Sequence, residues 1–319
     1  MNGLITKTSG SAYAVLLSDG SLVEAHVKGN FRIQGIRSTN PVAVGDRVMV
    51  QQLQDGTNWI TAIEDRRNYI IRRSTNLSKQ SHILAANIDQ AALIVTIDHP
   101  RTSTTFIDRF LATCEAYRVP AVLIFNKIDL LDDVGLEELH YLMELYSDLG
   151  YPCYGISARQ LQDEDNKQEV QQLIESIFSS SDGKYTLLSG NSGVGKSTLL
   201  NALFGREITR TGIISDAHDK GMHTTTFSEM YFLPEPANGA VIDTPGIKGF
   251  GTFDFQKEEV GHYFREIFRL SANCRFGNCT HCGEPGCAVV TALEIGSIAL
   301  SRFDSYLSLL GDCTETKYR

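Results

Sequence analysis

Short apolar segments separated by polar turns occupy residues 1–73 of the chain. Glycine and polar residues divide the segments, as at Ser18–Gly20 and at Gln54–Asn58. This pattern predicts five short β-strands that form a small β-barrel of the OB type; a β-sandwich is the alternative. The predicted strands are Leu4–Thr6, Tyr13–Leu17, Leu22–Val27, Arg47–Gln51 and Trp59–Ile63.

From about residue 74 the pattern changes to apolar runs that alternate with segments of helical spacing. Ala91–Thr96 and Ala121–Phe125 are apolar runs of the kind found in strands buried on both faces. Alternation of strands with helices predicts a parallel α/β sheet. The other predicted elements are strands at Pro152–Ile156, Tyr185–Leu188 and Ala240–Ile242, helices at Phe106–Tyr117, Leu136–Leu149 and Thr198–Leu203, and a surface loop at Gln162–Lys167.

After Phe253 the spacing becomes helical. A chain of 319 residues is long enough for two or three domains. We therefore expect a multidomain protein with an N-terminal β-barrel (residues 1–73), a central α/β domain (74–252) and a C-terminal α-helical domain (253–319). The predicted helices of this last part are Gln256–Leu270, Ala288–Ile295 and Ile298–Leu310.

Composition and charge narrow the class of protein. No apolar stretch approaches the roughly twenty residues of a membrane span, and Met1–Lys7 lacks the apolar core of a signal peptide. We therefore expect a cytoplasmic protein that does not bind membranes. The net charge of −9 argues against generic nucleic-acid binding, and we expect no DNA partner. Residues 1–75 nevertheless carry a net charge of +3, which fits either contact with RNA phosphates or a solvated surface.

A phosphate-binding loop is the strongest chemical signal. The segment from Gly190 to Ser197 matches G-x-x-x-x-G-K-[ST] between a predicted strand and a predicted helix. Its glycines let backbone N–H groups turn toward phosphate oxygens, Lys196 can reach the β- and γ-phosphates, and Ser197 can bind Mg²⁺. The alternative interpretation of this motif is an ordinary glycine-rich turn. The predicted phosphate-binding residues are Gly190, Asn191, Ser192, Gly193, Val194, Gly195, Lys196, Ser197 and Thr198.

Two further segments complete a triphosphate site. Asp243–Gly246 follows the predicted strand Ala240–Ile242, so Asp243 can hold Mg²⁺ through water and the Gly246 N–H can face the γ-phosphate. His223–Thr226 offers hydroxyls for Mg²⁺ in a loop that can become ordered with bound triphosphate, through either Thr224 or Thr225. An ordinary threonine-rich entry into a strand is the alternative for this second segment.

One segment is a candidate for recognition of the guanine base, and we call it the guanine reader. It lies at the end of a buried strand, where loops of α/β sheets bind ligands. Its residues are Asn126, Lys127, Ile128 and Asp129. Asp129 can accept hydrogen bonds from two guanine donors that adenine lacks, Asn126 can bond the other edge of the base, and the Lys127 stem can cover its face. Ser157–Ala158 can add a backbone N–H to the guanine oxygen. These features favour GTP over ATP. The reader precedes the phosphate loop, in reverse of the usual order, so the domain is predicted to be circularly permuted.

Cysteines cluster near the C-terminus, whereas Cys114, Cys153 and Cys313 are scattered. Clustered cysteines in an intracellular chain indicate metal rather than disulfides. Three cysteines and one histidine form a closed tetrahedral set typical of one structural Zn²⁺. Spacing leaves two ligand sets open, because Cys282 can replace His281. The first set is Cys274, Cys279, His281 and Cys287.

In this order the motifs resemble the RsgA (YjeQ/YloQ) family of circularly permuted GTPases. The resemblance covers nearly the whole chain and implies an OB-fold, a permuted GTPase domain and a zinc-binding domain, with His281 as the fourth ligand. It also implies binding to the 30S ribosomal subunit near its decoding region, hence to 16S rRNA, and GTP hydrolysis stimulated by that subunit. The segments that carry it are Ala85–Gln90, Asn126–Asp129, Gly190–Thr198, His223–Thr226, Asp243–Gly246 and Cys274–Cys287.

The expected function is therefore GTP hydrolysis that promotes or checks late maturation of the small subunit, by a monomer. Lys196, Thr225 and His223 are the predicted catalytic residues; His223 is chosen because aliphatic Ile247 replaces the usual water-orienting glutamine. A packing or capping role is the alternative for His223. Two rival functions are an rRNA-docking module whose GTP state only sets affinity, and an unrelated P-loop enzyme such as a kinase.

Overall fold

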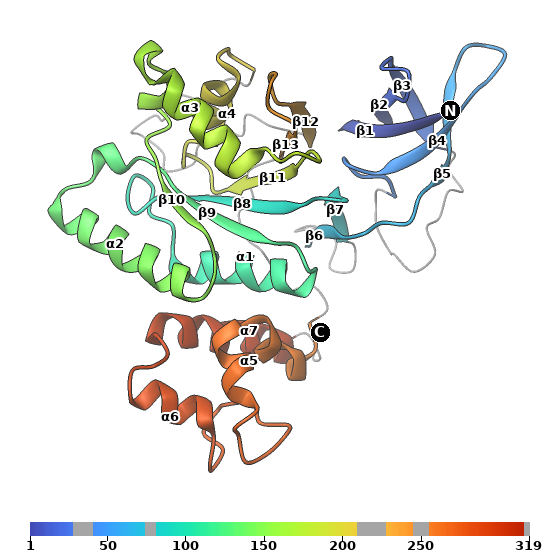
Figure 1. Cartoon of the computed structure of the whole chain (residues 1–319). Coiled ribbons are helices and arrows are strands. Elements are labelled where there is room, and N and C mark those ends of the chain that lie inside the picture. Colours follow the sequence, from blue (N-terminus) through green and yellow to red (C-terminus); the bar gives the residue numbers. More distant parts are fainter. Residues whose placement is uncertain (28–40, 74–80, 209–227, 245–254, 316–319) are drawn as a thin grey trace.

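The computed structural model describes residues 1–27, 41–73, 81–208, 228–244 and 255–315. A β-barrel, an α/β sheet with helices on both faces, and a helical C-terminal unit follow one another along the chain (Figure 1). The barrel lies beside one edge of the α/β sheet, and the C-terminal unit lies beneath helix α1. Each part therefore contacts the central sheet or one of its helices.

The N-terminal part is a closed five-stranded barrel, as the sequence predicts. Its strand order is β1-β2-β3-β5-β4, and β4 pairs with β1 to close it. Alternate side chains such as Ile5, Val15 and Ile60 fill the interior, which is the period-two pattern of strands with one buried face. The strands are β1 (Asn2–Ser9), β2 (Ala12–Leu17), β3 (Leu22–Val27), β4 (Arg47–Gln52) and β5 (Asn58–Ile63).

The central sheet is parallel across five strands, in the order β10-β9-β8-β11-β13. Its sixth strand, β12, is antiparallel to β13 and pairs on its other side with β1 of the barrel. A parallel sheet is therefore confirmed except at this edge, where an antiparallel strand joins two domains into one continuous sheet. The bounds are β8 (Gln90–Val95), β9 (Ala121–Phe125), β10 (Cys153–Gly155), β11 (Tyr185–Gly190), β12 (Glu229–Phe232) and β13 (Ala240–Asp243).

A hairpin that the sequence analysis did not predict lies between the barrel and the sheet. Strands β6 (Tyr69–Arg73) and β7 (Ser81–Ala86) pair only with each other among the described strands. Barrel residue Val44 forms a bridge with Ala85 of this hairpin. The hairpin therefore gives the barrel a second point of attachment, in addition to the β1–β12 pair.

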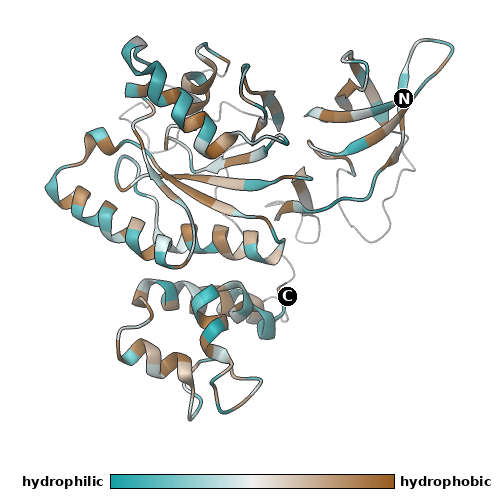
Figure 2. Ribbon diagram, in the orientation of Figure 1, coloured by the Kyte–Doolittle hydropathy of each residue, from teal (hydrophilic) through white to brown (hydrophobic). Residues whose placement is uncertain are grey.

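Helices cover both faces of the central sheet and turn their apolar sides toward it (Figures 1 and 2). One face carries α1 and α2, which pack in one core with β8 and β9. The other face carries α3 and α4, which pack in a second core with the same sheet. The helices are α1 (Thr104–Ala116), α2 (Asp133–Asp148), α3 (Lys167–Leu173), which continues as a π-helical turn (Ile174–Phe178), and α4 (Lys196–Phe204).

The strand order reverses direction between β8 and β11. Strands β8, β9 and β10 follow one another toward one edge, whereas β11 and β13 continue toward the other. Ligands of such sheets bind in the crevice outside the carboxyl ends of the strands at this reversal. Strand β11 lies in the middle of the sheet although it begins the second half of the domain's sequence, which is the arrangement expected of a circular permutation.

The C-terminal unit contains α5 (Arg265–Ser271), α6 (Ala288–Glu294) and α7 (Leu300–Glu315). The prediction of one helix over Gln256–Leu270 is wrong: a 3₁₀ segment (Lys257–Tyr263) ends at Phe264, whose backbone is extended (φ −113°, ψ 105°) before α5 begins. Val260, Phe264 and Ile267 are all buried in this unit's core. Their spacing of four and three residues would also place them on one face of a regular helix, so the apolar pattern gave no sign of the break.

Candidate nucleotide-binding site and metal centre

The phosphate loop joins β11 to α4 at the predicted place. Gly193 and Gly195 adopt left-handed backbone angles (φ 84° and 96°), and α4 begins at Lys196. A Cβ atom on Gly195 would lie 2.2 Å from Asn126 Nδ2, so a side chain at position 195 would displace the Asn126 amide. The loop therefore exposes backbone N–H groups at the start of a helix, where the helix dipole favours an anion.

Asn126 connects the guanine reader to the phosphate loop. It is 3 % exposed; its Nδ2 donates to Val194 O (2.7 Å), and its Oδ1 accepts from Ala158 N (2.8 Å). Asn126 and a backbone N–H of Ser157–Ala158 were predicted to bond the base. In the structure these polar groups bond each other and the phosphate loop, because three strand ends meet at this edge of the sheet. Asn126 therefore holds three loops of the site together.

Lys127 and Asp129 follow directly at the end of β9. Lys127 has left-handed backbone angles (φ 65°), and its Nζ donates a hydrogen bond to the carbonyl of His99. Burial lowers the pKa of Lys127, and the nearby Asp129 carboxylate opposes that change. Asp129 itself is exposed, in a short 3₁₀ turn with Ile128. Its carboxylate is accessible to a ligand, as a guanine-reading role requires.

Lys196 and Asp243 form an ion pair at the floor of the site. Lys196 Nζ lies 2.6 Å from Asp243 Oδ1 and also bonds the carbonyl of Thr244. Lys196 is 9 % exposed, and Asp243 is fully buried at the end of β13. The phosphate loop and the strand that precedes Asp243–Gly246 are thus brought together, although they lie far apart along the chain.

Several predicted residues lie outside the described part of the chain. These include His223, both candidate threonines and Gly246. The structure does bring the predicted phosphate loop, the guanine reader, Asp243 and the Ser157–Ala158 turn to one edge of the sheet. It adds the loop after β8, residues 96–103, to which the sequence analysis gave no role. One feature of the sequence could have indicated a role for this loop: it directly follows another buried strand of the same sheet.

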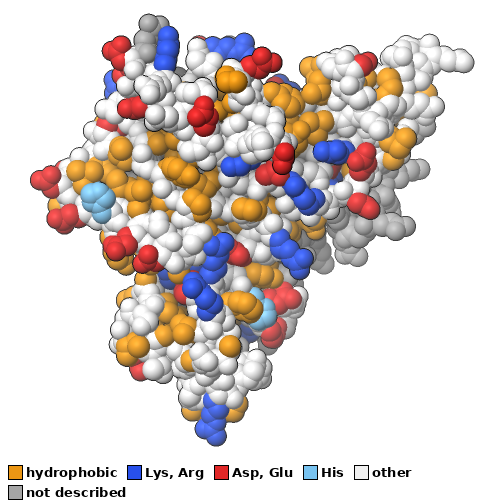
Figure 3. Space-filling view, viewed as in Figure 1, with side chains coloured by type: hydrophobic (Ala, Val, Ile, Leu, Met, Phe, Trp, Pro, Cys, Tyr) orange, Lys and Arg blue, Asp and Glu red, His pale blue; other side chains and the backbone are white. Residues whose placement is uncertain are grey.

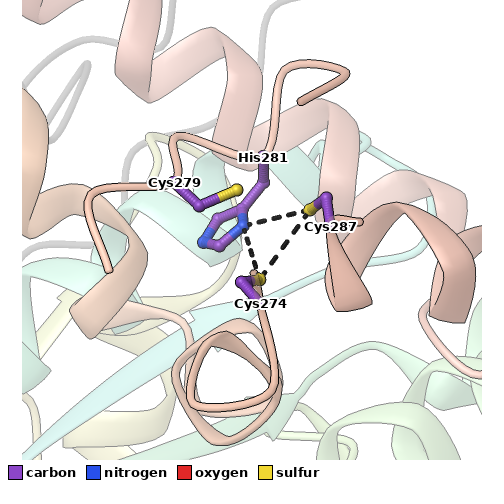
Figure 4. Close-up of side chains that lie close together, drawn as sticks. All are labelled: Cys274, Cys279, His281 and Cys287. Carbon is purple, nitrogen blue, oxygen red and sulfur yellow. Dashed lines mark hydrogen bonds between the residues drawn. The ribbon is translucent and has the colours of Figure 1, made fainter. Parts of the chain in front are cut away.

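The predicted metal ligands converge in the C-terminal unit (Figure 4). The ligand atoms of all four residues lie within 4.8 Å of one another. His281 Nδ1 is 3.4 Å from Cys287 Sγ and 3.7 Å from Cys274 Sγ, and the two sulfurs are 3.9 Å apart. A tetrahedral zinc site needs ligand separations of about 3.5–3.8 Å. The donor set and its spacing therefore fit Zn²⁺.

The alternative ligand Cys282 lies outside this cluster. It is exposed, and its sulfur points to Thr280 O at 3.4 Å. Glu284 holds the intervening turn by accepting hydrogen bonds from Thr280 N, Thr280 Oγ1 and Cys282 N (2.6–2.7 Å). Burial alone would raise the pKa of Glu284, but these hydrogen bonds outweigh it and set the pKa to about 2. A charged Glu284 thus shapes the turn that carries His281 into the cluster.

A permuted α/β sheet with a phosphate loop and a guanine reader at its carboxyl edge defines the class of circularly permuted GTPases. Comparison with known proteins gives the family. A family model for the RsgA GTPase matches residues 63–253, and one for the RsgA N-terminal domain matches residues 2–60. The chain belongs to the RsgA GTPase family.

Relatives match over the full length of the chain. The small ribosomal subunit biogenesis GTPase RsgA of Bacteroides fragilis is 59 % identical over 319 residues, which is 100 % of this chain and 99 % of the relative. The protein of the same name from Porphyromonas gingivalis is 54 % identical, again over 100 % of this chain and 99 % of the relative. The crystal structure of YjeQ from Thermotoga maritima has a TM-score of 0.72 and 30 % identity and covers 98 % of each chain. YloQ, described as a circularly permuted GTPase, has a TM-score of 0.69 and 26 % identity, over 100 % of this chain and 96 % of that one.

Proposed function

We propose that this protein binds the small (30S) ribosomal subunit and hydrolyses GTP to promote or check late subunit maturation. The observation that carries the proposal is the meeting of the phosphate loop and the guanine reader through Asn126. They meet in a chain that matches, end to end, a relative named for small ribosomal subunit biogenesis. A guanine nucleotide is the ligand that this pair of loops is built to hold.

In the proposed complex, Asp129 reads guanine, Lys127 covers the base, and Asn126 with the Ser157–Ala158 turn keeps the reader in place. Ser197 would hold Mg²⁺ directly and Asp243 would hold it through water, and the ion would neutralise charge on the phosphates. Lys196 then exchanges its carboxylate partner for phosphate oxygens. The proposed phosphate-binding residues are Gly190, Asn191, Ser192, Gly193, Val194, Gly195, Lys196, Ser197, Thr198 and Gly246.

For the chemical step we propose His223 as the group that orients the attacking water, with Thr225 and Lys196 stabilising the triphosphate. Ile247 cannot hydrogen-bond water, so another group has to do so. The His223→Ala variant should bind 30S subunits as the parent does but lose most of the stimulated turnover. Full stimulation of that variant would remove His223 from the chemistry.

The proposed partners are the 30S subunit and its 16S rRNA, and the protein is proposed to act as a monomer in the cytoplasm without DNA or membrane. None of the described helices is long and apolar enough to cross a bilayer. Acidic and basic side chains are interspersed on the face in Figure 3, and the net charge is −9. Contact with rRNA therefore depends on local basic regions such as the N-terminal barrel, rather than on the charge of the whole molecule.

We also propose that the cluster of Cys274, Cys279, His281 and Cys287 holds one structural Zn²⁺. All four ligand positions come from the protein, which leaves no open position for catalysis. The division into residues 1–73, 74–252 and 253–319 is proposed as the set of domains, which serve RNA binding, GTP hydrolysis and zinc binding.

The test is GTP turnover with and without purified 30S subunits. We expect slow hydrolysis by the protein alone, strong stimulation by 30S, and little by 50S subunits. Lys196→Ala is the control for contaminating GTPases and should show neither activity. Absence of stimulation, with guanine nucleotide binding intact, would contradict the proposed role. A protein that uses hydrolysis for its release should leave the 30S subunit with GTP and stay bound with a non-hydrolysable analogue. A docking module whose GTP state only sets affinity should behave in the same way with both nucleotides.

A further inference from the structure

The loop between β8 and α1 contacts both halves of the nucleotide site. The carbonyl of His99 accepts the hydrogen bond of Lys127 Nζ. Pro100 lies against the phosphate loop, since a Cβ atom on Gly193 would be 3.4 Å from Pro100 Cδ. The loop thus touches the guanine reader with one residue and the phosphate loop with the next, at the point where the strand order reverses.

Two buried threonines close this loop. Thr96 is 1 % exposed and Thr102 is 6 % exposed. The Thr96 hydroxyl donates to the carbonyl of Pro100, and Thr96 N donates to the hydroxyl of Thr102 (3.1 Å). A backbone bond from Thr102 N to Thr96 O (2.9 Å) completes the ring of contacts. These bonds set the path of His99 and Pro100, the residues that reach the nucleotide loops.

Valine has nearly the same shape as threonine and would fill the same space at positions 96 and 102. Packing alone therefore does not require a hydroxyl at either position. Their bonds go to the loop rather than to the surrounding core. Lys127 also needs a fixed acceptor, because its ammonium group is partly desolvated and burial lowers its pKa. The His99 carbonyl is that acceptor only while the loop keeps its closed path.

We propose that Thr96 and Thr102 are positioning residues for guanine nucleotide binding. They close the 96–102 loop so that the His99 carbonyl holds Lys127 beside the base and Pro100 supports the phosphate loop at Gly193. This inference rests on the proposed function of the site as a GTP site. The two threonines act through Lys127 and Gly193.

The experiment compares release of fluorescent GDP and GTP, and steady-state kinetics, for Thr96→Val and Thr102→Val. Loss of one or two hydrogen bonds predicts release about five- to thirtyfold faster and a KM higher by a similar factor, with kcat little changed. Thr96→Ser and Thr102→Ser keep the hydroxyl and should restore parent-like release. Thr113→Val is the matched control, because Thr113 is buried in α1 and its hydroxyl donates to Arg109 O in its own helix. It should behave as the parent does.

The outcomes separate this inference from the proposed function. If the parent protein fails to bind guanine nucleotides, the proposed function fails. If the parent binds them and both valine variants release them at the parent rate, the positioning role alone is wrong. Pro100→Ala is a second probe, because it removes the ring at Gly193 and leaves both hydroxyls in place. It should also release nucleotide faster; unchanged release from Pro100→Ala overturns the inference even where a valine variant fails to fold.

Discussion

At the scale of single residues, the phosphate loop depends on the absence of a side chain at Gly195. The left-handed angle of this glycine and the nearness of Asn126 Nδ2 are separate constraints. Gly205, at the other end of α4, is also left-handed (φ 60°), but a Cβ atom added there would have no neighbour within 4 Å. The two glycines therefore share a left-handed backbone but differ in their steric surroundings.

The Gly195→Ala variant should lose guanine nucleotide binding by tenfold or more, roughly, since its methyl group displaces the Asn126 amide that joins the loops. Gly205→Ala should bind as the parent does and lose only about 1 kcal/mol of stability from backbone strain. Nucleotide titration and thermal melting of both variants make the comparison. Equal nucleotide affinity in the two would show that the contact with Asn126 is unimportant.

Asp129 should decide the choice of base. Asp129→Asn replaces a double acceptor by a donor and an acceptor, so GTP affinity should fall about ten- to hundredfold while xanthosine triphosphate binds better. Asp132→Asn is the matched control, because Asp132 caps α2 through Gly135 N and asparagine caps equally well. Competition titrations with the two nucleotides measure the preference. An unchanged preference for GTP in Asp129→Asn would exclude this residue from the base site.

At the scale of elements, the C-terminal turn carries all four ligands of the proposed zinc site. The segment from Cys274 to Cys287 contains no regular helix or strand, and it lies between α5 and α6. Its order comes from the Glu284 hydrogen bonds and from the four convergent ligands. Bound Zn²⁺ would link these ligands and supply folding free energy that so small a core cannot provide.

The Cys279→Ser variant should therefore lose zinc and loosen the C-terminal unit, whereas Cys282→Ser should retain about one zinc ion per chain. Elemental analysis gives the metal content, and hydrogen exchange of α6 and α7 gives the local stability. The strands β8, β9 and β11 should keep their protection in both variants, because their cores are separate. Equal zinc content in the two variants would contradict the ligand assignment.

At the scale of the whole molecule, a buried charge cluster attaches the C-terminal unit to the GTPase domain. Arg302 of α7 is 1 % exposed and bonds Asp108 of α1 and Glu266 of α5, both at 2.7 Å. Tyr146 of α2 also donates to Asp108 (2.9 Å). Burial raises the pKa of Asp108, and the charge of Arg302 opposes that rise. The buried cluster therefore links four helices from two domains.

The Arg302→Met variant should lower the free energy of unfolding of the C-terminal unit by about 3–5 kcal/mol, because it leaves two buried carboxylates without their cation. Arg109→Met is the matched control at the same α1–α7 contact. The Arg109–Asp312 pair is partly exposed (20 % and 43 %), so its loss should cost less than about 1 kcal/mol. Urea denaturation with hydrogen exchange of α7 measures both. A similar small loss in the two variants would show that the buried cluster does not hold the domains together.

Amino-acid sequence by itself determined the features that contiguous residues encode. The barrel strands, the buried strands β8 and β9, the phosphate loop and the cysteine-rich turn each depend on local spacing and on residue types with special chemistry. Motif order along the chain was sufficient to predict the permutation. Helix α4 could be placed because its start follows from the glycines and lysine of the loop.

Tertiary structure alone decided which distant groups share a partner. In the folded chain the Asn126 amide bonds Val194 and Ala158. Strand β12 is antiparallel to β13 and pairs on its other side with β1 of the barrel. The tertiary structure also interrupted the predicted helix at Phe264 and buried Arg302 between Asp108 and Glu266. Each outcome depends on contacts between segments far apart in sequence, and the free energy of those contacts outweighs the local preference of any one segment.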